Sequence, residues 1–316
     1  KPLLAKRLPN QLPTILETLT PFRSRLKVVA VESTYNWYWL VDGLMEHGYP
    51  VVLANPSEME QYDGIKKADD LTDAAFLAKL ARLEVLPTGY IYPKQDRPVR
   101  DLLRRRMLLV QQRTGIVLSL QNLAMRQSGR SLPWRDLRKL DATERAELLG
   151  SHECLTFVAD EQIDLIEHLN EKIRRFEKKV LEHAQLKPEY ERLQTMPGVG
   201  VILALTIMLE TGDIGRFETV GDYTSYCRCV RATHSSNGKK KADNNSRNGN
   251  AYLAWAFVEA VHHAIRVCPK AKSFYDKKRA KRNGALATKA LAAKWSKAAY
   301  YILKRQEPFD LSRVFG

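Results

Sequence analysis

The chain has 316 residues, and 44% of them are hydrophobic, which is enough for a substantial core spread over more than one domain. Lys and Arg number 51 against 36 Asp and Glu, which gives a formal net charge of +15 at pH 7. No apolar run reaches the length of a membrane span and no signal peptide opens the chain, so we expect a cytoplasmic protein, not a membrane or exported one.

The N-terminal part of the sequence predicts an α/β arrangement. Val-rich runs at 26–34 and 49–56 predict buried strands, and residues 36–47 between them predict an amphipathic helix. Strand, helix, strand is a crossover unit, so we expect the two strands to be parallel neighbours. Residues 69–83 predict a further helix, whose inward side chains would be Ala74, Leu77, Ala78 and Leu80.

Long helices are predicted for the middle of the chain. Apolar residues recur at helical spacing from 99 to 125, and a polar, Arg-rich insert follows at 128–147. At 161–185 the apolar spacing alternates between three and four, which is typical of a coiled-coil seam formed by Ile166, Leu169, Ile173, Phe176 and Val180. A helix packed on its own domain would show the same pattern, but the dense charge on its other faces favours a long antiparallel arm or a dimer arm.

The last part of the chain, from residue 190, is predicted to be helical throughout. A Pro-Gly-Val-Gly turn at 197–200 leads into an apolar helix. Such a turn can bind phosphate through the free amides of the helix N-terminus, or it can simply pack against a neighbouring helix. The sequence leaves both alternatives open.

Three carboxylates in the N-terminal part are candidate metal ligands. Glu32 falls at the carboxyl end of the first predicted strand, where ligands collect in open α/β sheets. Asp70 and Asp73 are one helical turn apart and therefore face the same way. Acidic residues also stabilise helix N-termini, so capping is the simpler explanation for this pair. If all three converge, they suit Mg²⁺, which prefers carboxylate oxygens.

A polar stretch between two apolar helices carries adjacent serines. Residues 232–253 read ATHSSNGKKKADNNSRNGNAYL, so Ser235 and Ser236 are followed by a Lys- and Asn-rich run and then by a helix near Asn250. A serine hydroxyl is a poor nucleophile unless a base, a metal or a positive environment assists it, and this stretch is strongly positive. Turn capping is the ordinary role of serines in such loops.

Several motifs together resemble one known family. They occur in one order along essentially the whole chain: VAVESTYNWYWL, ADDLTDAAFLA, YIYPKQDRPVRDLLRRR, TMPGVG, RFETVGDYTSYCRCV and SSNGK…NGNAYLAWAF. The sequence resembles the DEDD transposases of bacterial insertion sequences, known as bridge-RNA-guided recombinases. The resemblance implies an RNase H-like (RuvC-like) domain lacking its first strand at 1–95, a helical linker and coiled-coil arm at 96–189, and a helical transposase domain with the catalytic serine at 190–316.

The resemblance also implies catalytic residues. Glu32 matches the family's second acidic residue, and Asp70 and Asp73 match the last two, so these three would hold Mg²⁺. The first acidic residue has no counterpart, from which we expect the sequence to begin after the strand that carries it. Ser236 matches the nucleophilic serine of the family, with Ser235 as the alternative. It would attack a DNA phosphodiester, form a phosphoserine and lead through a Holliday junction, at a site completed by a partner subunit's carboxylates.

The partners implied by the resemblance are a structured guide RNA, target and donor DNA, and further copies of the chain, as a homodimer that assembles to a tetramer on the bacterial nucleoid. The basic residues that we expect to contact nucleic acid, each also explicable as solvated surface, are Arg104, Arg105, Arg106, Arg126, Arg130, Lys239, Lys240, Lys241, Arg247, Lys277, Lys278, Arg279, Lys281 and Arg282. Two other functions stay open: a metal-dependent RuvC-like junction nuclease without serine chemistry, and a non-catalytic RNA-binding protein.

Overall fold

A computed structural model describes residues 3–34, 36–59, 70–184, 187–230, 234–236, 239–241 and 248–316, with the backbone alone described at 57–58, 234–236 and 239–241. The chain divides into two compact units. The first comprises residues 1–95 and 244–248, and the second comprises 96–243 and 249–316.

A three-stranded mixed sheet forms the centre of the first unit, in the order β1 (Val29–Glu32), β2 (Val51–Ala54), β3 (Thr88–Gly89). β1 and β2 are parallel, with Val29 opposite Val51 and Glu32 opposite Ala54, so the predicted crossover is confirmed. β3 runs antiparallel to β2. Both parallel strands are shorter than predicted. β2 is bounded by Pro50 and Pro56, which have no N–H to donate to a ladder.

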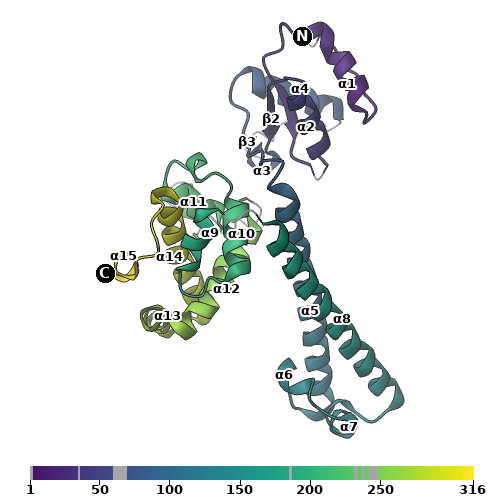
Figure 1. The fold of residues 1–316 in the computed structure, drawn as a ribbon, viewed down its shortest axis with the longest axis vertical. Helices are drawn as coiled ribbons and strands as arrows, with labels where there is room; N and C mark the ends of the chain where they lie inside the picture. The colour runs from purple at the N-terminus through teal and green to yellow at the C-terminus, as the bar shows by residue number, and fades with distance from the viewer. Residues whose placement is uncertain are drawn as a thin grey trace. The chain divides into compact units, whose positions relative to one another are not determined.

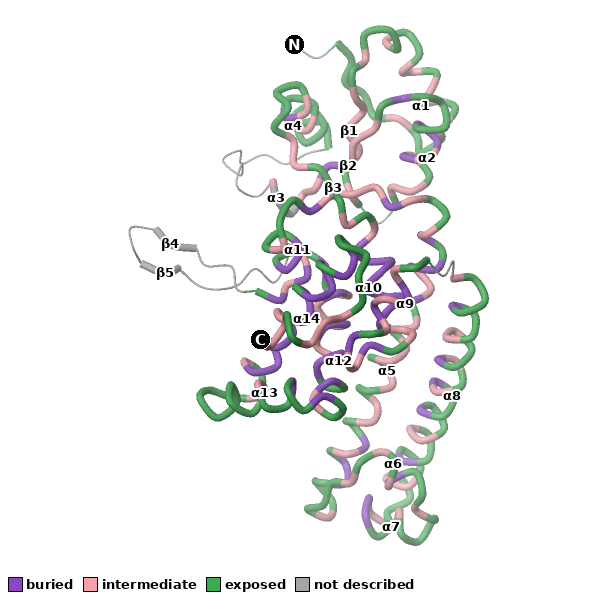
Figure 2. The backbone as a smooth tube through the Cα atoms, turned by 60° about the vertical axis from the view of Figure 1, so that its left-hand side comes forward, coloured by how far each residue is buried: buried purple, intermediate pink, exposed green. Residues whose placement is uncertain are grey.

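The helices of the first unit are α1 (Leu12–Leu19), η1 (Thr20–Phe22), α2 (Tyr38–Glu46), α3 (Pro56–Met59) and α4 (Asp70–Arg82), of which α2 packs against β2 and α4 against β1. α2 is the crossover helix and buries Val41 and Leu44. In α4, Leu80 is buried and Leu77 half-buried, but Ala74 and Ala78 are exposed. Figure 2 shows most of α4 in the green of exposed residues. The prediction that both alanines face inward was wrong, because only the C-terminal half of α4 has buried or half-buried side chains.

Two long helices of the second unit, α5 (Arg97–Ser128) and α8 (Glu153–His183), form an arm (Figure 1). Side-chain hydrogen bonds join Arg106 to Glu177 (2.6 Å), Arg113 to Asn170 (2.9 Å) and Gln162 to Ser119 (3.3 Å). Residue numbers rise along one helix as they fall along the other, so the helices are antiparallel. The seam residues Ile166, Leu169, Ile173 and Val180 are buried and Phe176 is half-buried. The arm is therefore built within one chain, while its coiled-coil geometry stays a prediction.

Two short helices close the far end of the arm, α6 (Trp134–Leu137) and α7 (Ala142–Leu149), where the sequence predicted only a polar insert. α7 begins with a capping box in which the Asp141 carboxylate accepts a hydrogen bond from the Glu144 amide. Leu137, Leu148 and Leu149 pack with Leu120 of α5 in a small core. These few apolar residues anchor a segment that is otherwise polar, which explains why periodicity did not reveal it.

The rest of the second unit is a helical domain. It contains α9 (Pro188–Gln194), α10 (Val201–Thr211), η3 (Ile214–Arg216), α11 (Val220–Tyr226), α12 (Ala251–Val267), α13 (Pro269–Lys281), α14 (Gly284–Arg305) and α15 (Leu311–Phe315). α10 is buried all round from Leu203 to Thr211, as expected of a helix whose residues are mostly apolar. Among the described helices of the whole chain, none is both long and apolar enough to cross a bilayer.

The Pro-Gly-Val-Gly turn packs against α12. Gly198 has a φ of +82°, and a Cβ placed there would lie 2.3 Å from the carbonyl oxygen of Ala260. The indole Nε1 of the buried Trp295 donates a hydrogen bond to the Pro197 carbonyl oxygen (3.0 Å). These contacts favour a packing turn over a phosphate-binding one.

Candidate functional site

The two serines lie in the first strand of a short hairpin, where the sequence predicted a loop. β4 (His234–Ser236) pairs antiparallel with β5 (Lys239–Lys241), so that Ser236 is opposite Lys239 and Ser235 is opposite Lys240. The hairpin thus brings the backbone of each serine beside the backbone of a lysine. Arg247, which we predicted to contact nucleic acid, lies outside the described residues.

The two chain ends that lead into and out of this stretch are held together. The amide of Asn250 donates a hydrogen bond to the Tyr226 carbonyl oxygen (2.6 Å), and the Arg228 guanidinium donates to the Gly249 carbonyl oxygen (3.0 Å). Gly249 has a φ of +84°, and a Cβ there would lie 2.5 Å from the Tyr226 oxygen. Only glycine fits this approach, which accounts for the Gly-Asn pair at the start of α12.

Asn250 uses both ends of its amide. The Oδ1 atom caps α12 by accepting hydrogen bonds from the amides of Tyr252 (2.9 Å) and Leu253 (3.1 Å). The Nδ2 atom donates to a Glu210 carboxylate oxygen (2.8 Å) and to the Tyr226 hydroxyl (3.3 Å). Asn250 is only 6% exposed, so each of these bonds is made away from bulk water.

Glu210, on α10, is the centre of a buried polar cluster. Arg104 of α5 contacts its carboxylate with Nε (2.5 Å) and Nη2 (2.8 Å), and Arg100 contacts it with Nε (3.1 Å). Burial by itself would raise the pKa of Glu210, but hydrogen bonds and positive charge from Arg104, Arg100 and Asn250 lower that pKa below its ordinary value. The carboxylate is therefore ionised and paired.

The Glu210 cluster, meaning Glu210 with Arg100, Arg104, Asn250 and Tyr226, joins four helices. Arg100 and Arg104 belong to α5, Glu210 to α10, Tyr226 to α11, and Asn250 starts α12. The Arg104 guanidinium also lies over the Tyr252 ring, 4.3 Å from its centroid. One polar network thus connects the start of α5, at the base of the arm, to Asn250, the residue at the end of the serine-bearing stretch.

The sequence analysis did not identify this cluster. Glu210 is a lone carboxylate in the otherwise apolar run VILALTIMLE, and an acidic residue in a helix buried on all sides needs a buried partner. The lone glutamate in this helix therefore predicts a cationic partner, such as an arginine, from elsewhere in the chain.

Two members of the arginine run at 104–106 have carboxylate partners within the protein, and their predicted contact with nucleic acid stays a prediction. Arg104 pairs with Glu210 and Arg106 pairs with Glu177 across the arm at 2.6 Å, with 28% and 15% of their side chains exposed. Both guanidinium groups are engaged within the protein, because each lies on the face of α5 that packs on another helix. Arg105 is exposed, and its contact with nucleic acid stays a prediction.

The other predicted nucleic-acid contacts that can be placed lie on exposed surface. Arg126 is in the last turn of α5 and Arg130 follows it, at the far end of the arm. Five more follow one another at the end of α13 and just beyond it, namely Lys277, Lys278, Arg279, Lys281 and Arg282. Their exposure leaves them accessible to phosphates. For Lys239, Lys240 and Lys241 the backbone alone is described, in β5.

The three candidate carboxylates lie on neighbouring elements of the first unit. Glu32 is the last residue of β1, Asp70 and Asp73 are in the first turn of α4, and α4 packs against β1. All three are exposed. Carboxylates are the donors that Mg²⁺ prefers. Among the described residues, however, no three His, Cys, Asp or Glu side chains are grouped so that they could hold a metal ion, so these positions alone do not form a complete site.

Comparison with known proteins gives the class of the molecule. The profile described as "Transposase IS116/IS110/IS902 family" matches residues 190–276, and a profile of the DEDD type from IS110 elements, described as "Transposase", matches residues 1–126. The first match includes the serine hairpin, Gly249, Asn250 and Glu210. The second includes Glu32, Asp70 and Asp73, and implies an RNase H-like fold for this part of the chain.

Individual relatives agree. A probable family 20 transposase of Pseudomonas aeruginosa is 25% identical over 250 residues, covering 76% of this chain and 72% of the relative. The transposase for insertion sequence element IS1111A of Coxiella burnetii is 25% identical over 283 residues, covering 87% and 76%. A putative transposase of Sinorhizobium fredii is 26% identical over 236 residues, covering 72% and 55%. Both parts of the chain are thus similar to transposases of insertion sequences, and the two matching profiles describe transposases of the IS110/IS116 type.

Proposed function

We propose that this chain is an RNA-guided DNA recombinase that cuts and exchanges strands through Ser236, with Ser235 as the alternative nucleophile. One observation carries the proposal: the stretch that bears the serines is clasped at its base by Gly249, Asn250 and the buried Glu210. Such fixed ends limit the conformations of the serine-bearing stretch, which is what a nucleophile requires for a defined approach to phosphorus.

The covalent step conserves the phosphodiester. The Oγ of Ser236 forms a bond to the phosphorus as the bond to the 3′ oxygen breaks, the serine hydroxyl loses its proton, and the 3′ oxygen leaves as a hydroxyl after gaining one. In the reverse sense, a 3′ hydroxyl of the other DNA attacks the phosphoserine and releases the serine. Two such exchanges proceed through a Holliday junction without hydrolysis. Positive charge on Lys239 and Lys240 would favour the alkoxide and the phosphate.

Glu32, Asp70 and Asp73 are the residues that we propose as ligands of Mg²⁺, together with further donors, since the three alone are not grouped as a site. A divalent cation bound there would offset negative charge on a DNA phosphate. We propose that these carboxylates act with the serine of another subunit, in a dimer that assembles to a tetramer.

Guide RNA is proposed as the source of sequence choice. The charge of +15 suits a polyanionic partner, and the exposed basic positions at 126, 130 and 277–282 are suited to backbone phosphates, which carry no sequence information. Base pairing with an RNA would supply the information that such contacts lack.

The test is to trap the covalent intermediate. Purified protein is incubated with Mg²⁺, the noncoding RNA transcribed beside the reading frame, and labelled DNA that carries a nick beside the exchange site, and adducts are separated on a denaturing gel. We expect an adduct with the wild type that disappears in Ser236→Ala and persists in Ser235→Ala. The opposite pattern would identify Ser235 as the nucleophile.

Two other outcomes would replace the proposal. If Ser236→Ala and Ser235→Ala both still cut DNA while Asp73→Ala does not, the protein is a metal-dependent nuclease. If the wild type binds RNA but gives neither an adduct nor recombination between two plasmids that carry the sites, the protein is an RNA-binding protein without this catalytic activity.

A further inference from the structure

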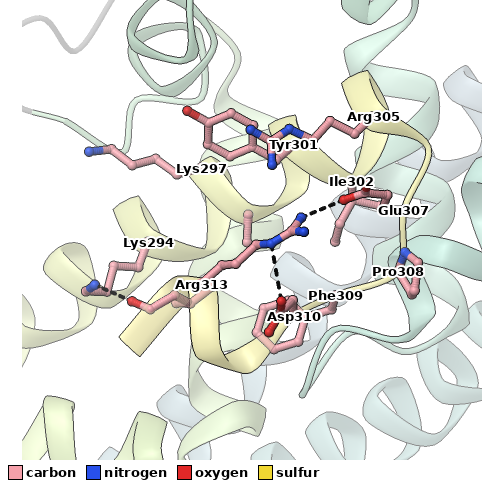
Figure 3. Close-up of a pocket in the computed structure, with 12 residues that line it drawn as sticks. Lys294, Lys297, Tyr301, Ile302, Arg305, Glu307, Pro308, Phe309, Asp310 and Arg313 are labelled. Atoms are coloured by element: carbon pink, nitrogen blue, oxygen red, sulfur yellow. Dashed lines mark hydrogen bonds and ion pairs between the residues drawn. The ribbon is translucent and has the colours of Figure 1, made fainter. Parts of the chain in front are cut away.

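A pocket of about 350 Å³ lies between α14 and the C-terminal segment that follows it (Figure 3). Its apolar wall includes Ile302, which is buried, and Phe309. Tyr301, Lys297 and Arg305 stand at its rim, and Arg313 crosses it from the C-terminal helix α15. The pocket has the volume of a small-ligand site and combines an apolar wall with cations.

The two acidic residues of the pocket, Glu307 and Asp310, share one guanidinium. The Arg313 guanidinium donates to Glu307 (2.6 Å) and pairs with Asp310 (3.3 Å). Asp310 also accepts hydrogen bonds from the amide and the hydroxyl of Ser312 (2.8 and 2.6 Å). The lining holds four cations, Lys294, Lys297, Arg305 and Arg313, against these two carboxylates, so its net charge is positive.

Lys297, Tyr301 and Arg305 follow one another at intervals of four residues, so they form a single stripe along α14. The stripe spans about 12 Å of helix axis and alternates cation, ring, cation. Tyr301 is 41% exposed, and the Arg305 guanidinium lies 4.6 Å from the centroid of its ring. An exposed ring beside a guanidinium is a stacking surface for a planar group, and Lys297 adds a cation one helical turn away.

We propose that this pocket binds one unstacked nucleotide of a single-stranded nucleic acid, with the base against Tyr301 and Arg305 and a neighbouring phosphate at Lys297. Base stacking on aromatic side chains with cations along the backbone is the general chemistry of single-strand binding. A duplex does not suit the site, because paired bases are stacked on one another and present no free face to the ring. The inference goes beyond the proposed function, since it requires neither Ser236 nor strand cleavage.

The experiment measures binding of the full chain to a fluorescent single-stranded oligonucleotide by anisotropy, with an RNA arm, a DNA arm and a duplex of the same sequence. Tyr301→Ala and Lys297→Ala are compared with Lys304→Ala, which removes an exposed lysine of α14 that does not line the pocket. We expect Tyr301→Ala to weaken single-strand binding about tenfold and Tyr301→Phe to retain it, because stacking needs the ring but not its hydroxyl. Thermal unfolding midpoints equal to the wild type's show that the variants are folded.

The outcomes separate cleanly. If Tyr301→Ala and Lys297→Ala weaken single-strand binding no more than Lys304→Ala does, the pocket is not the site. If they weaken duplex binding equally, the pocket contacts phosphates without a base and the proposal is also overturned. The RNA and DNA arms identify which strand it takes. If the wild type binds no nucleic acid at all, the proposed function is contradicted as well. If the wild type binds and the pocket variants bind equally well, only the assignment of the pocket is wrong.

Discussion

Asn250 donates a hydrogen bond from Nδ2 to the Glu210 carboxylate at 2.8 Å, while its Oδ1 caps the helix that follows the serine-bearing stretch. One side chain therefore fixes the end of that stretch to α10, and through Glu210 to Arg100 and Arg104 of the arm. The pairing makes the position of the end of this stretch dependent on a buried ion cluster, and it leads to specific predictions.

Replacement of Asn250 by Asp keeps the cap but substitutes an acceptor for the donor that faces Glu210. Two carboxylates then meet in a buried site, and we expect the free energy of unfolding to fall by about 3 kcal/mol. Denaturant unfolding measures this. The matched control is Asn283→Asp, since Asn283 is an exposed cap of α14 that accepts from the Leu286 amide, and Asp caps equally well. Equal effects at the two positions would contradict the prediction.

Glu210→Gln removes the negative charge that faces the buried Arg100 and the half-buried Arg104, so we expect the free energy of unfolding to fall by about 3–5 kcal/mol. The pH dependence has a definite sign. The pKa of Glu210 is lowered in the folded protein, so its contribution is present above the unfolded value, about 4.3, and is lost as pH falls through the folded pKa. Urea unfolding of wild type and Glu210→Gln should differ most near neutral pH and converge in acid. A constant difference would show that the charge is not what stabilises the cluster.

Gly249→Ala tests the contacts with Tyr226 and Arg228 that hold the two ends of the serine-bearing stretch together. The φ of +84° and the 2.5 Å approach to the Tyr226 oxygen leave no space for a Cβ, so we expect a loss of about 1–3 kcal/mol together with reduced formation of the phosphoserine adduct. Gly115→Ala is the control, because Gly115 lies in the middle of α5 with nothing within 4 Å of an added Cβ. There, alanine should stabilise the helix by up to about 1 kcal/mol.

Local patterns predicted much of the fold. The parallel strands around 29–32 and 51–54, the helix that begins at Asp70 and the buried seam of α8 all follow from periodicity and from turn residues within a few positions. The hairpin at 234–241 was not predicted, because its strands are three residues each and too short for a period to register.

The candidate site was less predictable for a physical reason. The one-turn spacing of Asp70 and Asp73 is local, but the distance of either from Glu32 depends on how α4 packs on the sheet. In the same way, Arg104 and Arg106 look like solvent-facing charge in the sequence, and only the packing of α5 against α10 and α8 supplies Glu210 and Glu177. When two residues of an ion pair are far apart in the chain, the sequence around each of them does not reveal the partner.

The arginine run provides a direct comparison of the two roles. Arg105→Ala removes an exposed charge, so we expect an unchanged free energy of unfolding and weaker nucleic-acid binding. The slope of the logarithm of the binding constant against the logarithm of salt concentration should fall in magnitude by about one. Arg106→Ala breaks the pair with Glu177 at the arm seam, so we expect it to lower stability by about 1–2 kcal/mol while the salt dependence of binding stays the same. Binding titrations at several salt concentrations, beside denaturant unfolding of both variants, measure the two effects separately. If Arg106→Ala lowers the salt dependence as much as Arg105→Ala, then Arg106 exchanges Glu177 for a phosphate when nucleic acid binds, and the intramolecular role assigned to it is wrong.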